Sequence, residues 1–73
     1  MSKLPVISGK DCVKVLEKIG FTVKRQEGSH IVMRRENPFN QLVVPNHKTL
    51  DRGTLRAIIR QADLSVSDFT KNL

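Results

Sequence analysis

Two histidines are the residues of this chain best suited to moving protons near neutral pH. An imidazole has an unperturbed pKa of about 6.5, so it can accept or donate a proton under physiological conditions. His30 follows Gly28-Ser29 between two strand-like runs, and His47 lies in a polar connection further along. The chain has 1 cysteine, no tryptophan and no tyrosine. We therefore expect any acid–base catalysis by this protein to depend on these two imidazole groups.

Each of these residues also has a purely structural interpretation. His30 would then be an exposed histidine that begins a strand, and His47 a solvated loop residue. Gly28 would supply the positive φ that a hairpin turn needs, and Ser29 would hydrogen-bond the turn backbone. No cysteine, aspartate or glutamate is spaced to complete a metal site with the two histidines. We predict neither a metal ion nor a small-molecule cofactor.

The composition indicates one small basic domain, which we place at residues 1–73. The 13 lysines and arginines outnumber the 7 aspartates and glutamates, which gives a net charge of +6. Such a chain is expected to bind a polyanion, with RNA or another nucleic acid as the first candidate and an acidic protein surface as the second. The simpler alternative is that the charge only keeps the domain soluble.

Two further features predict a cytoplasmic protein without membrane contact. Cys12 is the only cysteine and cannot form an internal disulfide, which fits a reducing compartment. The apolar runs are too short for a signal sequence or a membrane span. Cys12 is therefore expected to be a small core residue.

A first helix is predicted between Ser8 and Gly20. Ser8 and Asp11 resemble a capping box, and Gly20 is a typical C-terminal stop. One side of this helix carries apolar residues at helical spacing, namely Cys12, Val13, Val15, Leu16 and Ile19. The helix is therefore expected to bury that side against the rest of the domain.

Three antiparallel strands in meander order are predicted next. Residues 21–26 begin with alternating apolar and polar side chains, and residues 27–29 form a short turn. Residues 30–35 form the return strand, residues 36–40 a second turn, and residues 41–44 a third strand that ends at Pro45.

A second helix completes the domain. It carries an apolar stripe formed by Leu55, Ile58, Ile59 and Ala62, and Ser65 with Asp68 predicts a short helical tail. The fold class is therefore α+β, of order α-β-β-β-α. It combines a three-stranded antiparallel sheet with both helices on one face and a short C-terminal helical tail.

The other face of the sheet is expected to be open. If Phe21 and Val23 face the helices, alternation places on the open face Thr22, Lys24 and Gln26 of the first strand, and His30, Val32 and Arg34 of the second. Lys24, His30 and Arg34 would then form a cationic patch around an imidazole, suited to a phosphodiester. This patch depends on the register, because a slip of one residue reverses the two faces.

Five short pieces of sequence occur in a characteristic order. They are Ser8-Gly9-Lys10, Leu16 through Gly20-Phe21, Gly28-Ser29-His30, Val44-Pro45-Asn46-His47, and the segment from Gly53-Thr54-Leu55 through Ala62 and Leu64-Ser65 to Phe69. Together they resemble the HicA family of small toxins from bacterial and archaeal toxin–antitoxin pairs, over nearly the whole chain. The resemblance implies a double-stranded-RNA-binding-domain-like fold, which agrees with the order α-β-β-β-α.

The resemblance also implies a function. A HicA toxin is a metal-independent mRNA endoribonuclease, sequence-limited or ribosome-independent, that a HicB-type antitoxin keeps silent. His30 matches the family's catalytic histidine, and Gly28 and Ser29 match the turn that presents it. We expect RNA to be bound by Lys24, Ser29, Arg34, His47 and Lys48, with His47 also the best candidate for a second proton carrier. Asp63 departs from the family pattern, since many relatives have glycine at this cap position.

Two other functions remain open from the sequence. The main alternative is a module of the same fold that binds RNA without cleaving it. Lys48, Arg52 and Arg56 lie near the start of the second helix, where double-stranded RNA-binding domains grip phosphates. A third possibility is a protein-interaction module that uses its basic face on an acidic partner and has no affinity for RNA.

Overall fold

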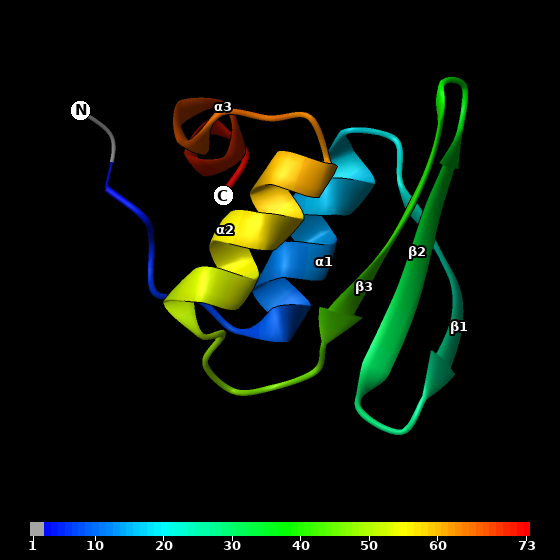
Figure 1. Cartoon of the computed structure of the whole chain (residues 1–73), viewed down its shortest axis with the longest axis horizontal. Helices are drawn as coiled ribbons and strands as arrows, with labels where there is room; N and C mark the ends of the chain where they lie inside the picture. Colours follow the sequence, from blue (N-terminus) through cyan, green and yellow to red (C-terminus); the bar gives the residue numbers. More distant parts are fainter. Residues whose placement is uncertain (1–2) are drawn as a thin grey trace.

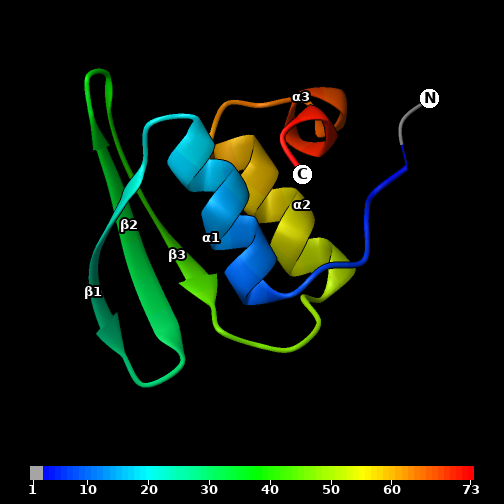
Figure 2. The same ribbon diagram turned by 180° about the vertical axis from the view of Figure 1, so that it is seen from behind.

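Two helices cover one face of a three-stranded sheet, and a third helix closes one end (Figures 1 and 2). The computed structural model describes residues 3–73. Its elements are α1 (Gly9–Lys18), β1 (Thr22–Glu27), β2 (His30–Glu36), β3 (Phe39–Pro45), α2 (Arg52–Gln61) and α3 (Val66–Lys71). The strands are antiparallel and lie in the order β1-β2-β3. The predicted α+β, double-stranded-RNA-binding-domain-like fold is confirmed, including the helical tail.

The predicted signals at both ends of α1 are confirmed. The Ser8 side chain accepts a hydrogen bond from the Asp11 backbone N–H at 3.1 Å. At the other end, Gly20 has a φ of +103°, a conformation that favours glycine. Helix α1 therefore begins and ends where its flanking residues dictate.

Helix α2 begins with a cap that the sequence did not predict. The Asp51 carboxylate accepts hydrogen bonds from the backbone N–H groups of Gly53 and Thr54, at 3.1 and 3.4 Å. The helix is followed by Asp63, which has a φ of +64°. Asp63 therefore takes the left-handed cap position that favours glycine. Ser65 and Asp68 then form a complete capping box at the start of α3.

Replacing Asp63 with glycine should stabilise the domain. Glycine has no steric penalty at a positive φ, and the change removes a carboxylate from the negative end of the α2 dipole. We expect a gain of about 0.5–1 kcal/mol in the free energy of unfolding and a rise in Tm of a few degrees, roughly 2–8 °C. Thermal unfolding of Asp63→Gly beside the wild type measures this, and a lower Tm for the variant would contradict the cap assignment.

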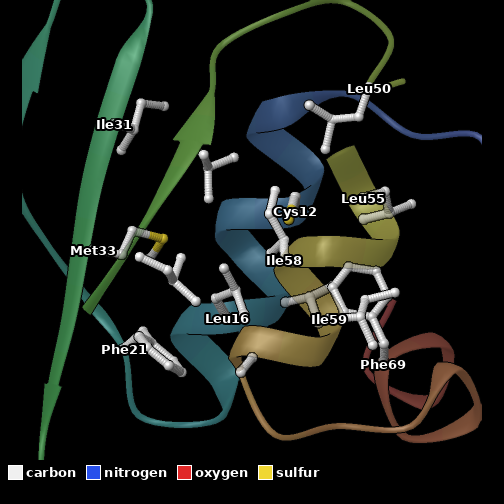
Figure 3. Packing of buried hydrophobic residues seen from close by; sticks show 14 of the residues in the cluster. Cys12, Leu16, Phe21, Ile31, Met33, Leu50, Leu55, Ile58, Ile59 and Phe69 are labelled. Atoms are coloured by element: carbon white, nitrogen blue, oxygen red, sulfur yellow. The ribbon is translucent and has the colours of Figure 1, made fainter. Parts of the chain in front are cut away.

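The core lies between the sheet and the two long helices (Figure 3). Phe21, Met33 and Leu16 are almost completely buried on the sheet side, and Phe69 of α3 is buried beside Ile59 of α2. Phe69 is the buried residue of the six-residue helix α3. Its aromatic side chain buries a large apolar area, and this packing holds the helical tail against the domain. Cys12 is buried in the same core and has no disulfide partner.

Cys12 should be unreactive while the domain is folded. Burial raises the pKa of the Cys12 thiol from 9.0 to about 12, because the thiolate loses its hydration. The folded state thus holds the proton more tightly than the unfolded state, so stability should fall as the pH rises from 9.0 towards 12. At mildly alkaline pH, a chromogenic aromatic disulfide should react with the Cys12 thiol only when the protein is unfolded in concentrated guanidinium. Rapid labelling of the folded protein would contradict the buried position.

A β-bulge in β1 corrects the predicted open face. The pairing of β1 with β2 shifts between Val23 and Arg25, so Lys24 occupies the extra position. Gln26 then pairs with Ile31 and turns to the helix side, where it lines a hollow with Lys10 and other residues of α1. The expectation that Gln26 shares the open face with Thr22 is therefore wrong, and Lys24 stands outside the regular alternation. Arg25 takes the place on the open face, since it pairs with Val32.

The strands β2 and β3 are longer than predicted. The turn between them contains only Asn37 and Pro38, so Glu36 and Phe39 belong to the strands. On β2, Ile31 and Met33 face the core, whereas Val32 pairs with the exposed Val43 on the opposite face. The predicted orientation of His30, Val32 and Arg34 towards the open face is thereby confirmed, because alternate residues of a strand share a face.

Candidate functional site

Three segments that are distant in the sequence meet at one end of the domain. They are the β1–β2 turn, the loop that follows β3, and the start of α1 (Figure 1). The Asn46 N–H donates to the Ser29 carbonyl oxygen at 2.6 Å, and the Gly9 N–H donates to the His47 carbonyl oxygen at 2.8 Å. These two backbone bonds hold the segments that carry both histidines next to each other.

His30 stands at the first position of β2, between the two other strands. It pairs with Glu27 on β1 and with Pro45 on β3, and its side chain is exposed on the open face. Within residues 3–73, no side chain or backbone group forms a hydrogen bond with the His30 ring. The imidazole nitrogens are therefore available to a ligand, as a general acid or base requires.

The turn before His30 has the conformation that the sequence predicted. Gly28 has a φ of +59°, and the space around its α-carbon is open. Ser29 is exposed and contributes its carbonyl oxygen to the bond with Asn46. The Gly28-Ser29 turn thus presents His30 and also connects it to the loop that carries His47.

His47 and two lysines surround a hollow beside this turn. The hollow is lined by Ser8, Lys10, Asn46, His47 and Lys48. The side chains of Lys10, His47 and Lys48 are exposed, so the hollow has two cationic groups and one imidazole at its rim. A phosphate group is the ligand that such a rim suits best, because ammonium and imidazolium groups donate charge-assisted hydrogen bonds to it.

Lys10 lines this hollow although the sequence did not single it out as a candidate site residue. It also lines the neighbouring hollow, together with Asn46 and Ile31, and so lies between α1 and the first residues of β2. Its position in the segment Ser8-Gly9-Lys10, at the start of α1, is the sequence feature that could have indicated this role. Only the hydrogen bond from Gly9 to the His47 carbonyl reveals that this helix start reaches the histidine loop.

Gly9 is required where α1 meets the end of β3. A Cβ atom added at Gly9 would clash with the Pro45 carbonyl oxygen and would lie 3.0 Å from the Asn46 α-carbon. Both neighbours are backbone atoms, which cannot rotate away as a side chain does. The absence of a side chain at Gly9 therefore allows the helix start to approach the loop that carries His47.

In the predicted cationic patch of Lys24, His30 and Arg34, the arginine lies apart from the histidine. Arg34 is four residues from His30 along β2, a separation of about 13 Å. Its guanidinium is bound to Gln41 Oε1 at 3.0 Å and lies 5.8 Å from the centre of the Phe39 ring. The structure instead brings Lys10 and Lys48 to the histidine loop.

Neither a metal cluster nor a membrane span is found in the described part of the chain. Across residues 3–73, no group of three or more histidine, cysteine, aspartate or glutamate side chains is placed to hold a metal ion. Among the helices of the same range, none is long and apolar enough to cross a membrane.

Comparison with known proteins assigns the family. Residues 9–64 match the family model of the HicA toxin of bacterial toxin-antitoxin systems. The chain belongs to the HicA toxin family. A comparison with curated proteins found no match. The HicA match begins at Gly9 and ends just after Asp63, so it covers all three site segments and leaves out α3.

Membership of the HicA family makes this protein a toxin of a toxin–antitoxin system. The predicted resemblance is thereby confirmed. Among the residues that carried it, Gly9, Gly28, His30 and His47 lie together at one end of the domain.

Proposed function

We propose that this HicA toxin is an endoribonuclease that cleaves mRNA with His30 as its catalytic histidine. The observation that supports this most directly is the exposed imidazole of His30, which forms no hydrogen bond within residues 3–73 and follows a turn that a backbone bond from Asn46 to Ser29 joins to the loop carrying His47 and the cationic rim. The rim would hold the phosphodiester, and the imidazole would move the proton. His30 is the residue that touches the reacting atoms in this proposal.

The proposed reaction is an internal transesterification. The ribose 2′-hydroxyl attacks the adjacent phosphorus, and His30 accepts the hydroxyl proton as general base. The bond between phosphorus and the 5′ oxygen breaks, and that oxygen takes a proton from a second acid, for which His47 is the best candidate. The products are a 2′,3′-cyclic phosphate and a 5′-hydroxyl, so no water is consumed in this step.

Positively charged groups would stabilise the phosphorane-like transition state. Lys10 and Lys48 line the same hollow as His47, and both side chains are exposed. An ammonium group near the developing charge lowers the barrier without transferring a proton. Ser29 and His47 would add RNA contacts at the turn and the loop, and a HicB-type antitoxin would silence the toxin by covering this end of the domain.

The chemical identity of the product ends tests this proposal. Purified protein is incubated with a labelled single-stranded RNA in the presence of a chelator, and the fragments are analysed for cyclic phosphate and 5′-hydroxyl ends. We expect both ends to form without added metal. Fragments with 5′-phosphate ends, or activity that the chelator abolishes, would contradict the proposed transesterification.

A non-catalytic RNA-binding module is the second candidate, and one observation favours it. Arg52, Arg56 and Arg60 are all exposed along α2, and none of them forms an ion pair with a carboxylate of residues 3–73. These three arginines would bind RNA phosphates without cleaving the RNA, and the affinity would fall steeply as the salt concentration rises. In the same assay this module would bind the RNA and leave it intact.

A further inference from the structure

The two edges of the sheet differ in how they are protected. Strand β1 has a bulge at Lys24 and the charged residues Arg25 and Glu27, which natural proteins use to prevent another strand from pairing. Strand β3 has the sequence FNQLVVP, with no charged residue, and its register with β2 runs without a bulge from Phe39 to Pro45. Only the proline at its end interrupts the row of backbone groups. The β3 edge is thus open to strand pairing.

An uncharged hollow lies beside this open edge. It is formed between Leu42, Val43 and Pro45 of β3 and Thr54 and Ala57 of α2. No charged side chain lines it, and Ala57 is exposed and has only a methyl group. A strand placed next to β3 would therefore find room for small or branched uncharged side chains on the helix side of the sheet.

We propose that an extended segment of the antitoxin pairs with β3 as a fourth strand of the sheet. The inference rests on the toxin–antitoxin partnership and does not depend on RNA cleavage. Unpaired backbone groups at an edge are satisfied by another strand, and the adjacent hollow supplies specificity for its side chains. The antitoxin strand would present uncharged side chains to this hollow.

Charge complementarity favours an acidic partner over a second copy of this chain. Each copy carries a net charge of +6, so two copies would repel each other. The only charged side chains of α2, which borders the hollow, are Arg52, Arg56 and Arg60. Acidic residues next to the added strand would meet these guanidinium groups.

The position of β3 connects this docking edge to the candidate site. The strand ends at Pro45, which pairs with His30 and directly precedes Asn46 and His47. An antitoxin segment that follows β3 to its end would therefore reach the two histidines. Strand addition would place the partner over the site without any contact to the core.

Two edge variants and a matched control test the docking edge. Val43→Lys puts a charge on the β3 edge, and Ala57→Arg fills the hollow; Val43 is 45 % exposed. Val23→Lys is the control, because Val23 is a 44 % exposed valine on the other edge strand. The probe is the purified protein encoded by the reading frame adjacent to the toxin gene. Circular dichroism confirms that each variant is folded.

Titration calorimetry should show both β3-side variants binding this probe at least about 30-fold more weakly, with Val23→Lys within about threefold of the wild type. Amide hydrogen exchange of the wild-type complex should show new protection along β3 and none along β1. Equal affinities for all folded variants, no protection along β3, or no binding of the wild type would overturn the proposal. RNA cleavage by the free variants is measured in parallel, so failure of the docking edge and failure of the proposed nuclease function give separate results.

Discussion

Replacing His30 with alanine should lower the rate of RNA cleavage by roughly 100- to 10,000-fold, because a positioned general base contributes about that factor. The fold should survive, since the His30 side chain is exposed and forms no hydrogen bond within residues 3–73. The measurement is the initial rate on a labelled RNA under single-turnover conditions, with Tm and RNA affinity determined for the same preparations.

His47→Ala is the companion to the His30 variant, because it removes the other exposed imidazole at the same end of the domain and separates phosphate binding from proton transfer. If His47 mainly binds phosphate, its loss should lower the rate by about tenfold, as expected for one hydrogen bond to a charged group. A larger loss, comparable to that of His30→Ala, would assign His47 to proton transfer as the second acid. A His30→Ala variant that cleaves RNA at the wild-type rate would refute the catalytic assignment.

Replacing Gly9 with alanine should cause the largest loss of stability among alanine substitutions of the four glycines of this chain. The new Cβ would meet the Pro45 carbonyl oxygen and the Asn46 α-carbon, so α1 and the loop after β3 would have to separate. We expect the free energy of unfolding to fall by about 3 kcal/mol, the upper part of the range for overpacking. In a domain of this size, that corresponds to a Tm lower by roughly 12–24 °C.

Gly53→Ala is the matched control for this clash, because Gly53 also lies in the first turn of a helix. An added Cβ there would lie 3.2 Å from the Asp51 Oδ2 atom, which belongs to a side chain that can move. The improved helix propensity offsets the contact, so the free energy of unfolding should change by less than about 1 kcal/mol. Similar Tm values for Gly9→Ala and the wild type would show that α1 does not need this close approach.

The elements of this fold follow from local sequence signals, whereas the open face of the sheet does not. Ser8, Gly20 and Ser65 each act within a few residues, and each was located from the sequence. The bulge at Lys24 reverses the faces of the second half of β1, because alternation holds only while each residue opposes one partner. Nothing in the run from Thr22 to Glu27 marks the extra residue.

The candidate site was predictable only where its residues are neighbours in the sequence. His30 and its Gly28-Ser29 turn are neighbours in the chain, so a local pattern was enough to single them out. Lys10 and Gly9 reach the histidine loop through a backbone bond across 38 residues of sequence, from the Gly9 N–H to the His47 carbonyl. Arg34 was expected at the site from its face alone, but its distance along β2 and its contacts with Gln41 and Phe39 separate it from His30.

Growth and mRNA integrity in cells that express either the wild-type chain or His30→Ala show whether toxicity depends on His30. Both proteins are induced to equal levels, and the folding of each is checked by circular dichroism. We expect growth arrest and loss of mRNA with the wild type and neither with the variant. Arrest and mRNA loss with both folded proteins, or intact mRNA with both, would contradict a His30-dependent ribonuclease toxin.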